Sequence, residues 1–127
     1  PGGKATAILD ALGNDGWLLA NESVRSRLGV LRFNLARHGA TRFALSQLDP
    51  QILADSLGPV FDAVLVDAPC SGQSLLGRGK QTESAFRTGT IAHCAARQER
   101  IVAAAARLVC PRGRLIYSTC TFSHAEN

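Results

Sequence analysis

Apolar residues follow two alternating patterns along this chain, short continuous runs and longer stretches at helical spacing. Short apolar runs of about four to eight residues are typical of strands covered on both faces of a sheet. On this basis we predict four strands, at residues 17–20, 41–46, 60–66 and 114–118. The run at 60–66 is the clearest of them.

Helical spacing fills the intervals between these runs. It predicts helices at residues 4–12, 23–37 and 91–109, with a short helix or turn at 50–57. Residues 71–90 are polar and contain four glycines, which predicts a long mobile loop. The alternation of strands and helices implies right-handed crossovers and therefore an α/β fold with a doubly wound, mostly parallel sheet.

Four strands are fewer than a nucleotide-binding sheet of this type usually contains. The chain also has no methionine and starts with Pro-Gly-Gly. We therefore expect residues 1–127 to be a fragment of one domain, incomplete at both ends, that lacks the first strand and the last strands. No apolar run is long enough to span a bilayer, so we expect a cytoplasmic protein without a membrane partner.

Composition is that of a globular chain, with 46% hydrophobic and 19% charged residues. The formal net charge is +4, with twelve arginines against two lysines. Arginine suits phosphate contacts, although solvated helix faces explain the excess equally well. Arg78, Lys80 and Arg87 are the better phosphate candidates, because they share the predicted loop with Cys70.

The chain contains four cysteines, Cys70, Cys94, Cys110 and Cys120. No two form a C-x-x-C pair and no histidine stands at zinc-finger spacing from them, so a metal site is not expected. A chain with its own core does not need disulfides, which favours free thiols in a reducing cytosol. Cys94 and Cys110 fall within or at the end of a predicted helix and are expected to be filler.

Cys70 and Cys120 each follow the end of a predicted strand. Cys70 comes after the run at 60–66 through Asp67, and Cys120 comes after the strand at 114–118. The carboxyl ends of parallel strands face the crevice where ligands bind. If the two strands are neighbours, both thiols and Asp67 share one pocket, and few reactions need two thiols.

Residues Pro1-Gly2-Gly3-Lys4 stand directly before the first predicted helix. Glycines there allow a ligand to approach the backbone, and the helix N-terminus offers N–H groups to an anion. A Walker-type phosphate loop is a poor match, because Ala5 follows the lysine where serine or threonine is required. An ordinary glycine-rich turn explains the motif equally well.

Two acidic residues follow the next two predicted strands. Glu22 stands where nucleotide-binding folds place the partner of the ribose hydroxyls, although a carboxylate at a helix N-terminus is an equal alternative. Asp49 has a position from which to accept a hydrogen bond from an exocyclic amine. Taken alone, it is slightly better explained as a turn former before Pro50.

Four strings now stand in a recognisable order: Pro-Gly-Gly-Lys, Asn-Glu-x4-Arg, Asp-Ala-Pro-Cys-Ser-Gly and Tyr-Ser-Thr-Cys-Thr, the last followed by Glu126-Asn127. Together they closely resemble the S-adenosylmethionine-dependent RNA cytosine-C5 methyltransferases of the Sun/Fmu (Nop2/Sun) family. The resemblance covers nearly the whole chain. Its second cysteine distinguishes the RNA enzymes from the DNA cytosine-C5 methyltransferases.

The resemblance implies a Rossmann-like methyltransferase that modifies carbon 5 of cytosine in RNA, ribosomal RNA rather than transfer RNA. It makes Cys120 the nucleophile, Cys70 the second cysteine that assists product release, and Asp67 the carboxylate between cofactor and base. The residues implied for binding S-adenosyl-L-methionine are Pro1, Gly2, Gly3, Lys4, Glu22, Asp49 and Asp67.

Some features depart from the family. The cofactor loop begins several residues earlier in the family, and residues 77–82 lack a proline expected after a basic pair. Two other classes of function therefore stay open. One is a non-catalytic RNA- or cofactor-binding module derived from such an enzyme. The other is a thiol-dependent redox enzyme, against which the lack of a C-x-x-C pair argues.

Overall fold

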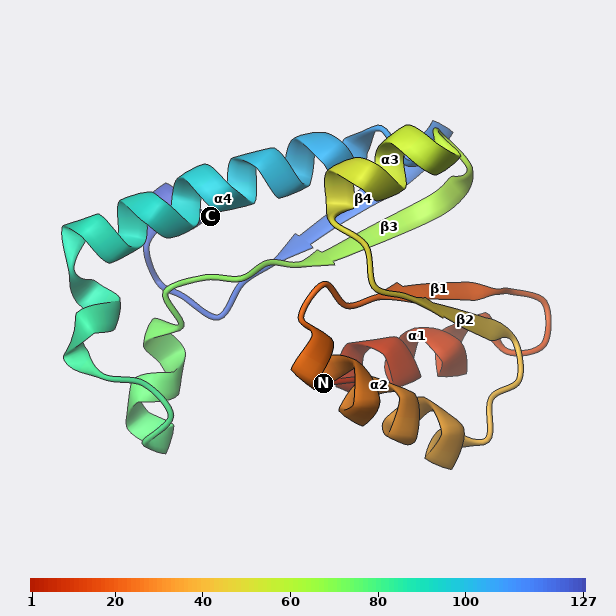
Figure 1. The fold of residues 1–127 in the computed structure, drawn as a ribbon, viewed down its shortest axis with the longest axis horizontal. Helices are drawn as coiled ribbons and strands as arrows, with labels where there is room; N and C mark the ends of the chain where they lie inside the picture. The colour runs from red at the N-terminus through yellow and green to blue at the C-terminus, as the bar shows by residue number, and fades with distance from the viewer. The chain divides into compact units, whose positions relative to one another are not determined.

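The computed structural model describes all residues, 1–127, and divides into two compact units, Pro1–Asp49 and Pro50–Asn127. Each unit contains one two-stranded parallel sheet with its own helices (Figure 1). The predicted α/β class with parallel strands is therefore confirmed. None of the helices combines the length and the apolar character that crossing a membrane requires.

The first unit contains α1 (Gly3–Leu12), β1 (Leu18–Asn21), α2 (Arg25–His38) and β2 (Phe43–Ser46). Both helices lie on the same side of the β1–β2 sheet (Figure 1). The buried core of this unit consists of Leu9, Ala20, Leu31 and Leu35. Helical spacing thus places Leu31 and Leu35 of α2 on the face that covers the sheet.

The second unit contains the elements that carry both cysteine loops. Its regular elements are α3 (Pro50–Leu57), β3 (Phe61–Asp67), α4 (Thr88–Ala106) and β4 (Val109–Ser118), with short 3₁₀ helices η1 (Gln73–Arg78), η2 (Glu83–Phe86) and η3 (His124–Glu126). Helices α3 and α4 lie on one side of the β3–β4 sheet (Figure 1). An ion pair of 2.7 Å between Arg107 and Asp55 connects the C-terminal end of α4 to α3.

The last strand begins earlier than the sequence predicts. Helix α4 ends at Ala106 rather than at residue 109, and Val109 already pairs with Phe61. Ladder pairing then resumes between Ala63 and Arg114, so residues 110–113 bulge out opposite Asp62. Arg112 adopts a left-handed φ of 68° in this bulge. The predicted turn at 111–113 therefore exists, but it interrupts a strand instead of preceding one.

Residues 71–90 are more ordered than the predicted mobile loop. They form η1 and η2, and α4 already begins at Thr88. Gln73 and Gln81 hold this segment through hydrogen bonds to the carbonyls of Ala85 and Ser71. Glycine content gave no signal of these tertiary contacts.

The strands are less covered than expected for a sheet with helices on both faces. In β4, for example, Ile116 is 46% exposed. Leu115 is 36% exposed as well. The expectation of strands covered on both faces is therefore not met by the apolar residues of β4.

The core of the first unit allows a test of its packing. Leu35 is fully buried (0% exposed), whereas Val30 of the same helix is 46% exposed. Leu35→Ala should lower the free energy of unfolding by about 2–5 kcal/mol, because it removes buried surface and leaves a cavity. Val30→Ala should change it by less than about 1 kcal/mol. Urea unfolding followed by the fluorescence of Trp17, the only tryptophan, measures both; equal losses would contradict the described core.

Candidate functional site

The ends of β3 and β4 lie side by side in the second unit. Their ladder finishes with Asp67 opposite Ser118, and the N–H of Ala68 donates to the Ser118 carbonyl at 2.9 Å. The two strands are thus parallel neighbours, as the two-thiol hypothesis requires. The loops that carry the cysteines start at the same edge of the sheet.

The sulfur atoms of Cys70 and Cys120 are 3.1 Å apart. The backbone N–H of Cys120 also donates to Cys70 Sγ at 3.2 Å. Neither cysteine is in a disulfide; Cys120 is exposed and Cys70 is partly buried. One location therefore holds two thiols, one of them open to solvent, and the chemical role of each stays a prediction.

Asp67 is the last residue of β3 and is exposed to solvent. The hydroxyl of Ser118 donates to its carboxylate at 3.3 Å across the strand pair. The carboxylate thus belongs to the same edge of the sheet as the two cysteine loops.

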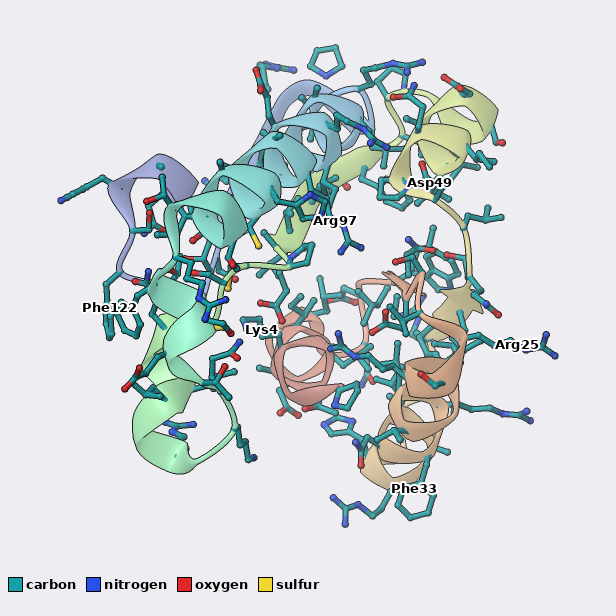
Figure 2. All side chains as sticks on the ribbon, turned by 60° about the vertical axis from the view of Figure 1, so that its left-hand side comes forward. Lys4, Arg25, Phe33, Asp49, Arg97 and Phe122 are labelled. Carbon is teal, nitrogen blue, oxygen red and sulfur yellow. The ribbon has the colours of Figure 1, made fainter.

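Side chains from the segment after Cys70 hold the second loop in place. The N–H and hydroxyl of Ser74 both donate to the Cys120 carbonyl, at 3.1 and 2.9 Å. Gln73 accepts the N–H of Phe122 at 3.0 Å. The Phe122 ring itself is 72% exposed and projects outward (Figure 2).

Position 72 favours glycine both by its backbone conformation and by the atoms around it. Its φ is 73°, a left-handed conformation that a Cβ disfavours. An added Cβ would also lie 3.4 Å from Gln81 Nε2, the group that donates to the Ser71 carbonyl, and 3.9 Å from Cys120 Sγ. The glycine after Cys70-Ser71 thus lets the chain turn close to the second thiol.

A buried carboxylate that sequence reasoning did not assign joins the two loops. Glu126 is 2% exposed and accepts hydrogen bonds from Ser71, Thr121 and Gln98. Burial opposes its charge, but these hydrogen bonds outweigh burial and hold the pKa of Glu126 below its ordinary value. The sequence did contain a signal for a shared partner of the two loops, because Cys70 and Cys120 are each followed directly by a hydroxyl residue, Ser71 and Thr121.

The charge of Glu126 also affects two neighbouring groups. Burial raises the pKa of the Cys94 thiol, and the negative charge of Glu126 raises it further. The pKa of Tyr117 is raised by the same causes, and its hydroxyl donates to the Glu126 carbonyl at 2.7 Å. Cys94 is therefore held as a neutral thiol, which agrees with its expected role as filler.

In the first unit, the two glycines at the start of α1 differ in whether a side chain would fit at their positions. Gly2 has a φ of 111°, and a Cβ there would lie 3.1 Å from Asn34 Cβ. Asn34 in turn donates to the Pro1 carbonyl at 2.7 Å. Packing against α2 thus explains Gly2. A Cβ at Gly3 would meet no atom within 4 Å apart from its chain neighbours and its own helix backbone, so open space borders the exposed Gly3.

Glu22 carries out the helix-terminal role that the sequence left as an alternative. Its carboxylate accepts the Val24 N–H at 3.0 Å and pairs with Arg27 Nε at 3.2 Å, at the start of α2. A carboxylate has about four acceptor positions, so capacity for ribose hydroxyls is left. Asp49 is exposed and directly precedes Pro50, the first residue of α3.

Asn21 has a structural role that was not predicted. Its side-chain oxygen accepts hydrogen bonds from the Ser46 hydroxyl and the Leu48 N–H, at 2.8 and 3.0 Å. These bonds join the end of β1 to the chain that leaves β2. The string Asn-Glu-x4-Arg thus fixes the carboxyl edge of the first sheet, because Asn21 binds β2 and the chain after it while Glu22 binds the start of α2.

The basic candidates Arg78, Lys80 and Arg87 lie on exposed parts of the segment with η1 and η2. The arginines of α2 are exposed as well, and Arg25 points away from its helix (Figure 2). Exposure is what a phosphate contact needs, but solvated arginines have it too. Their role in RNA binding stays a prediction.

Comparison with solved structures places the chain in the methyltransferase class. All of it aligns with 29% of the crystallised protein PH0851 (TM-score 0.89, 31% identity). It also aligns in full with 32% of NSun6 from Pyrococcus horikoshii with SFG (TM-score 0.82, 34% identity). The family model described as 16S rRNA methyltransferase RsmB/F matches residues 1–127, and the chain belongs to this family.

A curated relative agrees with this assignment. Ribosomal RNA small subunit methyltransferase F of Escherichia coli O17:K52:H18 (strain UMN026 / ExPEC) is 37% identical over 127 residues, which is 100% of this chain and 26% of the relative. The chain thus spans about a quarter of the length of the curated relatives it matches. The resemblance to RNA cytosine-C5 methyltransferases that the motifs indicated is confirmed.

The sulfur geometry predicts selective oxidation. A disulfide has an S–S length of about 2.05 Å, so the two sulfurs at 3.1 Å need to approach by only about 1 Å. Brief treatment with copper-phenanthroline in air should link Cys70 to Cys120 and leave Cys94 and Cys110 reduced. Mass mapping of proteolytic peptides, with Cys70→Ser as the control, detects the link. Pairing of Cys94 or Cys110 instead would contradict the described loops.

The lowered pKa of Glu126 predicts how stability depends on pH. Folding favours its carboxylate, so the stabilisation is present above the unfolded pKa of about 4.3 and is lost as pH falls through the lower folded value. Glu126→Gln should therefore cost about 2–3 kcal/mol at pH 7. The difference from the unsubstituted chain should shrink below about pH 4. Urea unfolding at pH 7 and pH 3.5 measures both; a constant difference would contradict an ionised Glu126.

Proposed function

We propose that the protein containing this chain transfers a methyl group from S-adenosylmethionine to carbon 5 of a cytosine in RNA. The observation that carries this proposal is the 3.1 Å approach of the Cys70 and Cys120 sulfurs at the carboxyl ends of adjacent parallel strands. The relatives named ribosomal RNA small subunit methyltransferase F favour ribosomal RNA as the substrate. The unit with the thiols supplies the covalent chemistry.

Cys120 is the nucleophile. Carbon 5 of cytosine is a poor nucleophile, and addition of the Cys120 thiolate to carbon 6 makes it enamine-like. The exposure of Cys120 agrees with this role, because the attacking sulfur must reach the face of an unstacked base. When bound, S-adenosylmethionine supplies an electrophilic methyl group for the activated carbon 5.

Cys70, acting as its thiolate, completes the reaction by removing the proton on carbon 5 after methylation, directly or through water. The electrons of that C–H bond form the carbon 5–carbon 6 double bond, and the carbon 6–sulfur bond breaks to return the Cys120 thiolate. Cys70 Sγ lies 3.1 Å from the Cys120 sulfur that leaves carbon 6, and this closeness supports the assignment. The sulfur contact then lets the proton pass between the two thiols.

Asp67 stabilises the base adduct. It ends β3 at the edge of the sheet from which both cysteine loops start, and its carboxyl group is exposed. A protonated Asp67 near ring N3 of the cytosine would hydrogen-bond the adduct and favour its formation. The hydroxyl of Ser118 fixes the orientation of this carboxyl group.

The residues of the first unit fit a cofactor of this kind. Gly3 borders open space at the N-terminus of α1, where first-turn N–H groups favour a carboxylate such as that of the methionine portion. Glu22 and Asp49 follow β1 and β2, and these positions support them as partners of the ribose hydroxyls and the adenine amine. Pro1, Gly2 and Lys4 complete the proposed set. A reaction that uses two reduced thiols requires reducing conditions, which is why we propose a cytoplasmic protein.

Trapping of a covalent RNA adduct tests the division of roles. In the full-length natural protein, Cys70→Ala should accumulate a covalent protein–RNA adduct, because the adduct forms but is not released. Denaturing gels resolve this adduct from the free protein. Cys120→Ala should form no adduct and lose methyl transfer by more than about 10³-fold. Cys94→Ala is the matched control and should behave as the unsubstituted protein.

Other outcomes of this test point to the rival functions. Adduct in Cys120→Ala rather than in Cys70→Ala would exchange the roles of the two thiols. Cofactor binding by equilibrium dialysis without adduct or methyl transfer in any variant would favour a non-catalytic binding module. A thiol-dependent redox enzyme would instead cycle a Cys70–Cys120 disulfide during turnover.

A further inference from the structure

The carboxylate of Glu126 joins both cysteine loops without touching either sulfur in any described hydrogen bond. Its Oε1 accepts from the hydroxyls of Ser71 and Thr121, at 2.6 and 3.2 Å. Its Oε2 accepts from the Ser71 N–H and the Gln98 side chain, at 2.9 and 3.0 Å. Each oxygen therefore has two donors, and the donors come from three separate segments of the second unit.

Two of the donor residues stand directly next to the thiols in sequence. Ser71 follows Cys70, and Thr121 follows Cys120. The two hydroxyls also contact each other at 2.9 Å. A shift of Glu126 would therefore move the residue beside each cysteine, and the two loops would move relative to one another.

Helix α4 takes part through Gln98, which is buried. Its amide nitrogen donates to Glu126 and also to the Pro69 carbonyl at 3.0 Å, one residue before Cys70. The amide oxygen of Gln98 is buried without a hydrogen-bond partner. A buried acceptor left unpaired costs about 1–3 kcal/mol. The two hydrogen bonds that the Gln98 nitrogen donates to Pro69 and Glu126 are therefore made at the expense of an unpaired amide oxygen.

An ionised carboxylate is the group that matches this set of donors. All four hydrogen bonds are donated to its oxygens. A glutamine amide would present one NH₂ group to two of these donors, which would repel it. Hydrogen bonds to a charged acceptor are also roughly twice as strong as neutral ones.

We propose that Glu126 is a positioning residue that fixes the separation of the Cys70 and Cys120 sulfurs by tying Ser71 to Thr121. Its effect on catalysis rests on the proposed methyl transfer, whereas its effect on the sulfurs does not. A misplacement of reacting groups by about 1 Å costs about 100-fold in rate. Glu126 therefore governs the chemical step rather than the binding of RNA or cofactor.

The first experiment measures the sulfur separation without any enzymatic activity. In the full-length natural protein with Cys94 and Cys110 changed to serine, the rate of Cys70–Cys120 disulfide formation by copper-phenanthroline is compared between variants. Glu126→Gln should lower this rate by about tenfold, because the thiols lose their mutual orientation. Glu99→Gln removes an equal charge from an exposed position on α4 and is the matched control. An unchanged rate in folded Glu126→Gln would overturn the proposal.

The second experiment separates positioning from stability. Glu126→Gln should lower kcat for methyl transfer by about 10- to 100-fold and leave the KM for RNA and for cofactor within about twofold. Ser71→Ala should lower kcat in the same direction, and the double variant should lose less than the sum, because both act through one bond. Equal losses in kcat and in substrate affinity, or additive effects, would contradict a positioning role.

Ser71→Ala also keeps the proposal testable if Glu126→Gln fails to fold. It removes the hydroxyl donor but retains the Ser71 N–H bond to Glu126. A folded Ser71→Ala with unchanged disulfide formation would then overturn the proposal and leave Glu126 a purely stabilising residue. Slower disulfide formation in a protein that shows no methyl transfer with any RNA would support positioning while the proposed function fails.

Discussion

The parallel pairing of β3 with β4 is the interaction on which the candidate site depends. Its register ends with Asp67 opposite Ser118, and one further hydrogen bond from Ala68 extends the pairing past the last strand residue. Parallel strands present their carboxyl ends at one edge of a sheet, so both loops must leave from the same place. Because each cysteine follows within three residues, strand pairing brings the two loops together, and the sulfurs lie 3.1 Å apart in the ordered loops.

Strand pairing alone does not order the loops, whose backbone groups lie beyond the ladder and still need partners. Polar side chains supply those partners across long sequence separations: Gln73 to Phe122, Ser74 to Cys120, Gln81 to Ser71, and Glu126 to Ser71. A buried charge is expensive unless its hydrogen bonds are made, and each oxygen of Glu126 has two donors. Loss of any one of these hydrogen bonds would leave a buried polar group without a partner, which costs free energy. The network is therefore suited to holding the two loops in one geometry.

The features that the sequence predicted are those with a local cause. Apolar runs located all four strands, and Cys70 and Cys120 at strand ends predicted their proximity. The order of residues 71–90 and the early start of β4 escaped prediction, because they arise from tertiary hydrogen bonds and from the pairing of Val109 with Phe61. Glu126 escaped for a related reason: glutamate is almost never fully buried without partners, and those partners lie up to 55 residues away.

The same proximity has two opposite chemical consequences. Sulfurs 3.1 Å apart can exchange a proton directly, which is what the proposed reaction needs, with one thiol forming a bond to the base and the other helping to break it. The distance also brings the pair within about 1 Å of a disulfide, which would remove both groups from the reaction. A geometry suited to two-thiol catalysis is thus inherently sensitive to oxidation. Reducing surroundings are then a requirement of the site itself, set by the register of one strand pair.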